Sequence, residues 1–233
     1  MSCILHIETA TSICSVAVSK EGKIIYEQEE SIGPSHASVL GVFVNGAIAE
    51  LRKNNIALDA VAVSCGPGSY TGLRIGVSEA KGLCFGLDIP LIAIETLTIM
   101  ATGVITKGLI SNDILLCPMI DARRMEVYDV ILDNQLNKIK SVSADIIDED
   151  SFGDLLKENK IAFFGNGADK CKDIIKHQNA IFIDDIHPYA KDMIELAEKA
   201  FNNREFVDVA YFEPFYLKEF VATTPKNKVL PPL

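Results

Sequence analysis

The chain of 233 residues has no tryptophan, and aromatic side chains make up only 7% of it. No two of its six cysteines are closer than Cys3 and Cys14, which excludes Cys-x-x-Cys zinc and thioredoxin-type motifs. Basic residues are scarce, with 22 Lys and Arg against 32 Asp and Glu and a net charge of −10. This balance excludes strong binding of the chain alone to nucleic acid or to an anionic membrane. The most apolar long stretch, 89–105, contains Pro90 and Glu95 and is too short to span a bilayer.

What is present is the composition of a folded protein. Hydrophobic residues make up 48% of the chain and charged residues 23%, which is typical of a globular protein with a sizeable core. The length allows one large domain or two lobes, at roughly 100–200 residues per domain. Most cysteines lie in apolar runs, so we expect buried, inert thiols. The first residues carry no basic segment and no cleavage site, which predicts a cytoplasmic protein.

One order of elements, βββαβαβα, occurs twice along the chain. Three antiparallel strands followed by βα units predict an α/β fold with a mixed sheet, and two copies predict two similar lobes that face a cleft. A chance repetition of the order is the alternative. The first copy has predicted strands at 3–7, 13–19, 23–29, 59–65 and 90–94 and helices at 35–53, 73–87 and 96–106, with Ser35 as an N-cap. The second has strands at 114–120, 126–132, 137–143, 161–164 and 180–183 and helices at 147–158, 168–176 and 187–202.

The glycine-rich loop 66–72 is the strongest local signal for a binding site. Its glycines allow unusual backbone conformations, and the helix that follows offers free N–H groups to an anion. Leu73 and Arg74 do not complete a P-loop, however, and Thr71 breaks the G-x-G-x-x-G pattern. A phosphate cradle and a tight turn without a ligand are both compatible with the pattern.

A second polar loop follows the first predicted strand. Its residues Glu8, Thr9, Thr11 and Ser12 combine a carboxylate with hydroxyls, which can hold a phosphate and its magnesium ion. A polar hairpin turn is the alternative. The turn 121–124 joins two strands and is a candidate charged turn of the site.

The two helices of the first half carry more apolar and small residues than packing on one sheet requires. Apolar residues of 35–51 cover more than one stripe, whereas such a helix normally keeps a polar outer face. The second helix has Gly72, Gly76 and Ala80 at four-residue spacing, although a glycine inside a helix costs about 1 kcal/mol relative to alanine. Dense internal packing and docking of a partner are the alternatives, and Phe43 is the first position to test.

Four segments carry a resemblance to a known family. They are ILHIETATSICSVAV at 4–18, GPGSYTGLRIGVSEAKGLCFGLDIPLIAI at 66–94, MIDARRMEVYD at 119–129 and PFYLK at 214–218. They resemble the bacterial TsaB family, also called YeaZ. The likeness is strongest over 1–100 and weak from about 137 to 185.

The resemblance implies an actin-like (ASKHA) fold built from two ribonuclease-H-like lobes. The lobes expected from it are an N-terminal lobe at 1–106 that carries the dimerisation helices and a smaller, degenerate lobe at 107–210. A C-terminal extension at 211–233 would follow, with a flexible end.

The resemblance also implies a place in the machinery that forms N6-threonylcarbamoyladenosine at position 37 of tRNAs that read codons beginning with A. There TsaD transfers the threonylcarbamoyl group and TsaE is an ATPase. TsaB-like proteins are non-catalytic scaffold subunits that pair with TsaD, or with themselves when TsaD is absent, through the first two helices. The interface residues expected by this likeness are His36, Val39, Leu40, Phe43, Val44, Ala47, Gly72, Arg74, Ile75, Gly76 and Ala80.

Two departures from related catalytic proteins support a subunit without its own chemistry. TsaD carries a metal-binding H-x-x-x-H where this chain reads Glu95-Thr96-Leu97-Thr98-Ile99, so no metal is expected. Glu8 stands where superfamily kinases have aspartate, which argues against a bound nucleotide and predicts no cofactor. The alternative function is an ATP-dependent small-molecule kinase or phosphotransferase of the same fold, while a peptidase lacks its nucleophile and metal motifs.

Overall fold

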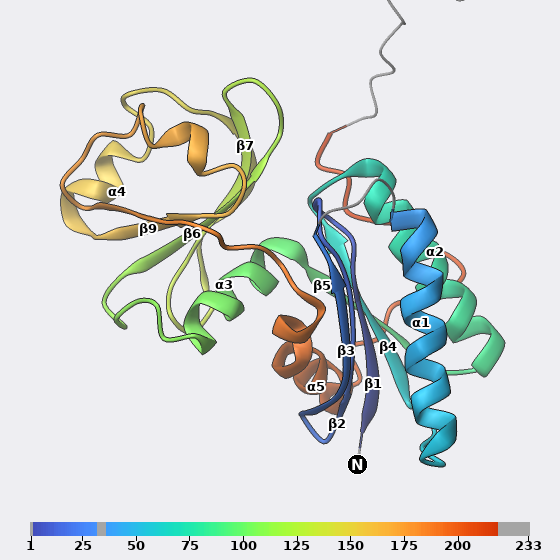
Figure 1. Ribbon diagram of the computed structural model, residues 1–233. Helices are drawn as coiled ribbons and strands as arrows, with labels where there is room; N and C mark the ends of the chain where they lie inside the picture. Colours follow the sequence, from blue (N-terminus) through green and yellow to red (C-terminus); the bar gives the residue numbers. More distant parts are fainter. Residues whose placement is uncertain (1, 32–35, 219–233) are drawn as a thin grey trace, which may run out of the picture.

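The structure is a computed structural model that describes residues 2–31 and 36–218. It contains two five-stranded sheets, ordered β3-β2-β1-β4-β5 and β8-β7-β6-β9-β10, which form the right-hand and left-hand lobes of Figure 1. In each sheet, three antiparallel strands are extended by two parallel ones. The predicted duplication and the α/β fold with two similar lobes are therefore confirmed.

The strands begin and end close to the predicted positions. In the first sheet they are β1 (Cys3–Glu8), β2 (Cys14–Lys20), β3 (Lys23–Glu30), β4 (Ala60–Gly66) and β5 (Leu91–Glu95). In the second they are β6 (Leu115–Asp121), β7 (Glu126–Leu132), β8 (Lys138–Ile146), β9 (Ile161–Phe164) and β10 (Ala180–Ile183).

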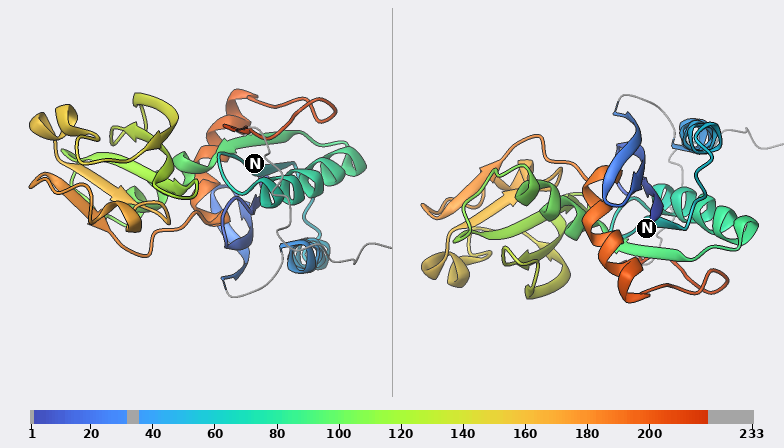
Figure 2. Two further views of the ribbon diagram at one scale, coloured as in Figure 1. Left: turned by 90° about the horizontal axis from the view of Figure 1, so that it is seen from above. Right: turned by 90° about the horizontal axis from the view of Figure 1, so that it is seen from below.

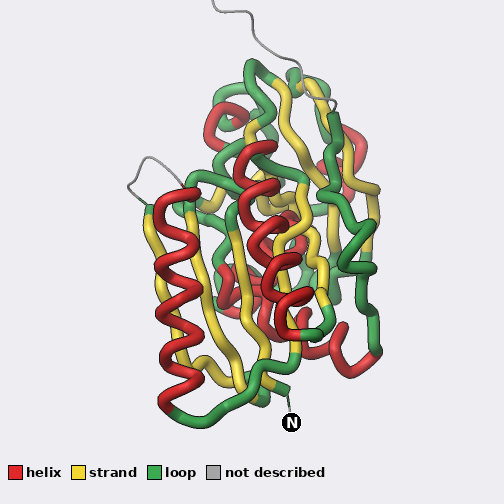
Figure 3. The backbone as a smooth tube through the Cα atoms, turned by 90° about the vertical axis from the view of Figure 1, so that its right-hand side faces the viewer, coloured by secondary structure: helices red, strands yellow, loops and turns green. Residues whose placement is uncertain are grey.

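The first sheet is covered on both faces. Helices α1 (His36–Lys53) and α2 (Tyr70–Leu87) pack on one face and lie beside each other over the strands in Figure 3. Helix α3 (Thr96–Thr106), the 3₁₀ turn η2 (Ala190–Met193) and helix α5 (Ile194–Asn203) cover the other face. Because both faces are covered, β1 and β4 are buried at every position, as is typical of central strands in α/β proteins.

Local signals explain how α2 begins and ends. The hydroxyl of Ser69 accepts a hydrogen bond from the Gly72 N–H at 3.2 Å and caps the first turn. Asp88 ends the helix in a left-handed conformation, and the Ile89 N–H bonds to the Cys84 carbonyl at 3.1 Å. The predicted N-cap of α1, Ser35, lies outside the described residues.

The second lobe has far less helix than the sequence predicts. The predicted helix 147–158 is reduced to α4 (Gly153–Glu158), because the side chain of Asp148 bonds Ser151 and holds the preceding residues in a turn. The predicted helix 168–176 is only the 3₁₀ turn η1 (Asp169–Cys171), because the N–H groups of Cys171, Lys172 and Ile174 bond to the carbonyl three residues back.

The boundary between the lobes also differs from the prediction of a second lobe at 107–210. Side chains of η2 and α5 pack against Ile4, Ala60 and Ile92 of the first sheet, and both views of Figure 2 show the orange-red α5 beside that lobe. Helix α3 lies between the two sheets and contributes to both cores. The second lobe therefore ends before η2, and the chain returns to the first lobe.

The six cysteines are free and buried, as predicted, and burial raises the pKa of the Cys65 thiol to about 12. Within 2–31 and 36–218, no helix combines the length and the apolarity that a membrane crossing requires. The start of the C-terminal extension contacts α2. The Lys81 ammonium of that helix donates to the carbonyls of Ala210 and Phe212 at 3.1 and 2.9 Å. Residues 219–233 lie outside the described part.

Candidate functional site

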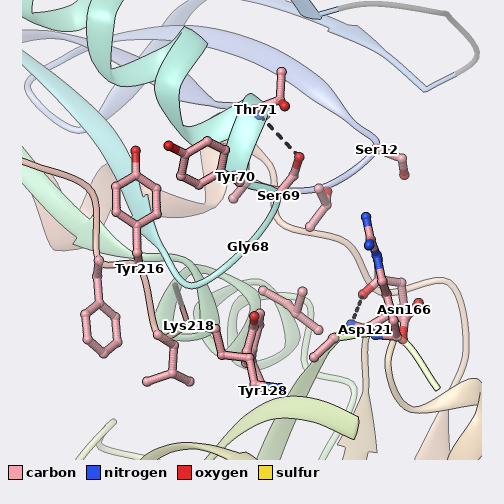
Figure 4. Close-up of a pocket in the computed structure, with 18 of the residues that line it drawn as sticks. Ser12, Gly68, Ser69, Tyr70, Thr71, Asp121, Tyr128, Asn166, Tyr216 and Lys218 are labelled. Atoms are coloured by element: carbon pink, nitrogen blue, oxygen red, sulfur yellow. Dashed lines mark hydrogen bonds between the residues drawn. The ribbon is translucent and has the colours of Figure 1, made fainter. Parts of the chain in front are cut away.

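A cleft of about 750 Å³ lies where loops of the two lobes meet (Figure 4). One side is formed by the loop after β1 and by the N-terminal end of α2, including Ser12 and Ser69. The other side is formed by Asp121, Arg123 and Asn166 of the second lobe, and residues 215–218 contribute a further wall. The two loops and the charged turn singled out from the sequence therefore meet at one site.

Each lobe contributes the same glycine arrangement to this site. Gly66-Pro67-Gly68 follows β4 and Gly165-Asn166-Gly167 follows β9, the corresponding strand. A Cβ atom on Gly68 would lie within 3 Å of the Ala10 carbonyl oxygen, and one on Gly167 would lie 2.8 Å from the Ile120 carbonyl carbon. In both lobes the glycine loop thus packs directly on the backbone around the end of the first strand.

This close packing uses two of the hydrogen-bond donors that an anion at the loop would need. The Ser69 N–H donates to the Ala10 carbonyl at 2.7 Å and the Gly72 N–H to the Ser69 hydroxyl. Of the two alternatives for the loop 66–72, the geometry favours the tight turn over the phosphate cradle.

The polar loop after β1 is also bonded within the protein. The Glu8 carboxyl is completely buried and accepts a hydrogen bond from the Ala10 N–H at 2.6 Å. Burial raises the pKa of Glu8 from 4.5 to about 7. The Thr9 hydroxyl donates to the Gly72 carbonyl at 2.8 Å, and of this loop only residues 10–12 line the cleft. Because Glu8 is turned away from the cleft, its carboxylate does not fit a magnesium ion held there.

The second lobe supplies the charges of the cleft. Arg123 and Arg124 have positive φ values of 73° and 52°, which is costly for residues other than glycine. The Lys170 ammonium stabilises this turn by donating to the Arg124 and Glu126 carbonyls at 2.8 and 2.7 Å. The side chain of Lys218 closes the cleft from the extension and pairs with Glu126.

The expected interface residues on α1 and α2 divide into two groups. The core side of the helices holds six of them: Leu40, Val44, Ala47, Gly72, Gly76 and Ala80 are buried within the chain. Because these six residues are enclosed by the chain itself, the predicted contact rests on the other five. Arg74 is exposed, and the remaining four, His36, Val39, Phe43 and Ile75, are half-buried.

The most exposed apolar side chains of these helices were not among the predicted interface residues. Val42 on α1 is 65% exposed and Phe85 on α2 is 86% exposed. Val42 lies opposite the buried stripe of Leu40, Val44, Ala47 and Leu51. A helical projection of the apolar residues would have separated it from that stripe.

Comparison with known proteins identifies the family. The family model described as TsaD, tRNA N6-adenosine threonylcarbamoyltransferase, matches residues 23–226. The tRNA threonylcarbamoyladenosine biosynthesis protein TsaB of Escherichia coli K12 is 30% identical over 227 residues, a match that covers 94% of this chain and 96% of that protein. The chain belongs to the TsaB family.

Other TsaB relatives agree over the same length. The Haemophilus influenzae TsaB is 27% identical, with 94% of each chain covered. Among solved structures, YeaZ from Pseudomonas aeruginosa has a TM-score of 0.75 at 27% identity and covers 93% of this chain and 100% of its own. A second Pseudomonas aeruginosa structure, of an uncharacterized protein with similarity to peptidase YEAZ, reaches a TM-score of 0.80 at 27% identity, with 94% of this chain and 100% of that one covered. The TsaB family resemblance and the fold that it implies are thus confirmed.

Proposed function

We propose that this chain acts in the biosynthesis of N6-threonylcarbamoyladenosine in tRNA, as a non-catalytic scaffold subunit that pairs with TsaD and works with TsaE. Family membership supports the pathway, because TsaB relatives are named for it. The observation that carries the scaffold role is the apolar area that Val42 on α1 and Phe85 on α2 expose.

This outer surface is suited to the close approach of another helix. Cβ atoms built on Gly41, Gly82 and Gly86 would meet no atom within 4 Å, so these glycines have no packing role inside the chain. Beside them, Val42 and Phe85 expose apolar area. Glycines next to exposed apolar side chains allow two helices to pack at short distance and to bury that apolar area.

The cleft supports the absence of catalysis by this chain. Both loops that would bind a phosphate are bonded to the protein itself, through Ala10, Ser69 and Gly72. The net charge of −10 further predicts poor binding of tRNA by this subunit alone, so its partners would supply the basic surface.

The interface is tested with Val42→Asp and Phe85→Asp, singly and together. A buried, unpaired carboxylate at a helical interface should weaken co-purification with TsaD by about tenfold or more, while the melting temperature of the free chain stays unchanged because both side chains are exposed. The matched control is Ile139→Asp, an equally polar change at an exposed apolar residue of the second lobe. Normal co-purification of the double variant would refute the interface.

The scaffold role is tested by reconstituting tRNA modification from TsaD and TsaE with and without this chain. Modification that proceeds at the same rate without the chain would reject a required subunit. The alternative kinase or phosphotransferase is favoured by Arg123 and Lys218 in the interlobe cleft. It predicts a calorimetric signal with millimolar Mg-ATP and turnover by this chain alone.

A further inference from the structure

A second cavity, of about 490 Å³, lies on the second lobe between the end of β8 and α4. Figure 1 shows α4 on the lobe remote from α1 and α2. At the rim of this groove Ile146 is 74% exposed. The apolar lining residues are Ala144, Ile146, Ile147, Phe152 and Leu155.

Phe152 lines the groove, and its ring contacts two neighbouring side chains. Its ring packs edge-on against Phe163 at 5.3 Å between centroids, and the Lys140 ammonium lies 5.2 Å from its centre. Lys140 in turn pairs with Asp129, at 2.8 Å, and with Asp145. The cation inside the groove is therefore already neutralised by the protein's own carboxylates.

The chain beside the groove carries a large negative charge, because residues 148–150 join the lining residues Ile147 and Ser151. The segment 145–158 contains six acidic residues and one lysine, which is half of the net charge of −10. Asp145 and Asp154 pair with lysines. By contrast, Asp148, Glu149 and Asp150 are exposed and form no ion pair with any cation of the described chain.

We propose that this groove is a docking site for a basic segment of a partner protein, which inserts an apolar side chain between Ile146 and Phe152 and places Lys or Arg against Asp148, Glu149 and Asp150. Charge complementarity decides the occupant. RNA would be repelled by the three unpaired carboxylates. The chain's own residues 219–233 contain two lysines and one glutamate and match the rim less well. This surface is separate from the α1/α2 face and extends the proposed function to a further contact.

The probe is a fluorescent, end-blocked 12-residue peptide of alternating lysine and leucine pairs, titrated with the full chain and followed by anisotropy. A second peptide has serine in place of every leucine. Because the groove adds apolar burial to charge attraction, we expect the leucine peptide to bind about tenfold more tightly. Its affinity should fall steeply with added salt, since the rim contacts are exposed.

Two variants test the residues of the groove. The change Ile146→Ser should reduce binding of the leucine peptide to the level of the serine peptide. The triple change Asp148→Asn, Glu149→Gln, Asp150→Asn should weaken it about tenfold and flatten the salt dependence. The matched control removes three exposed acids outside the groove, with Glu195→Gln, Glu205→Gln and Glu213→Gln, and should change the affinity less than twofold. Ile146→Ser leaves the α1/α2 face intact, so TsaD should still co-purify.

Four outcomes would overturn the proposal. Equal binding of both peptides, or equal loss with the control triple, would assign the effect to the overall charge of the chain. Tighter peptide binding by a chain that ends at Lys218 would make residues 219–233 the occupant of the groove. A change of oligomeric state on Ile146→Ser would make a second copy of the chain the occupant. Finally, binding of unmodified tRNA is compared between the parent chain and the triple variant. If the parent binds tRNA and the triple variant binds it no more tightly, the acidic residues do not repel RNA and the argument against RNA fails.

Discussion

The two lobes share one strand order but differ in how their sheets are covered. The first sheet has long helices on one face and α3, η2 and α5 on the other, whereas the second has only α4 and short turns besides the shared α3. The difference leaves an apolar groove open on the second lobe, with Ile146 at its rim. The duplication thus preserved the sheet and its glycine loops, while the layer of helices over the sheet diverged.

The largest effect is expected where the two lobes agree most closely. Gly68→Ala places a Cβ within 3 Å of backbone atoms of the loop after β1, and Gly167→Ala places one 2.8 Å from the backbone at the end of β6. Each change should lower the free energy of unfolding by about 3 kcal/mol, because backbone rather than a flexible side chain has to move. Urea unfolding measures this effect. Changes within about 0.5 kcal/mol of the parent would show that the packing is looser than the distances imply.

The buried carboxyl of the first lobe predicts a stability that depends on pH. Burial raises the pKa of Glu8 from 4.5 to about 7, so the folded state holds this proton more tightly than the unfolded one. Its contribution is fully present below pH 4.5 and is lost as the pH rises toward 7 and above. By linkage, the parent chain should lose up to about 3 kcal/mol of unfolding free energy between these limits, and Glu8→Gln should abolish this loss. Melting curves at pH 5 and pH 8 measure it, and an identical pH dependence in the variant would contradict the assignment.

Burial also raises the pKa of the buried carboxyl of the second lobe, Asp129, to about 6, but its replacement by an amide should have a different effect at pH 8. Asp129 is also completely buried, but it pairs with Lys140 at 2.8 Å, whereas Glu8 has no cation partner among the described residues. Asp129→Asn should therefore destabilise the protein by about 2 kcal/mol at pH 8, because Lys140 loses a charged hydrogen bond. Urea unfolding of the two amide variants side by side checks the contrast. A stabilising Asp129→Asn would show that Asp145 alone suffices for Lys140.

The smallest effect concerns the outer side of α2. A Cβ atom on Gly82 would meet no other atom within 4 Å, so Gly82→Ala should raise the free energy of unfolding by about 0.5–1 kcal/mol through helix propensity. Gly82→Leu should keep the monomer stable but weaken association with TsaD if a partner helix approaches there. Calorimetric melting and co-purification separate the two effects. Unchanged association of Gly82→Leu would move the proposed contact away from this turn of α2.

Inner strands such as β4 and β9 could be predicted from the sequence because they are apolar runs that end at glycine, at Gly66 and before Gly165. The second-lobe helices could not, since the hydrogen bond between Asp148 and Ser151 decides where α4 begins and no periodicity reports it. The roles of the α2 glycines were also hidden. The same residue type packs on the Thr9 hydroxyl at Gly76 and faces open space at Gly82, and only the position of the loop after β1 distinguishes the two.

The return of η2 and α5 to the first sheet has a consequence for the order in which the protein is made. The sheet of the first lobe is complete once β5 has been synthesised, yet Met193, Ala197 and Ala200, which cover its second face, come roughly a hundred residues later. During synthesis at about 5–20 residues per second, α3 follows β5 directly, but the part of that face that η2 and α5 cover stays exposed for several seconds. The second lobe has all of its own strands before η2 emerges. The lobe encoded second is therefore the first to have all of its own strands and helices, and the first lobe reaches its final packing only after η2 and α5 have been made.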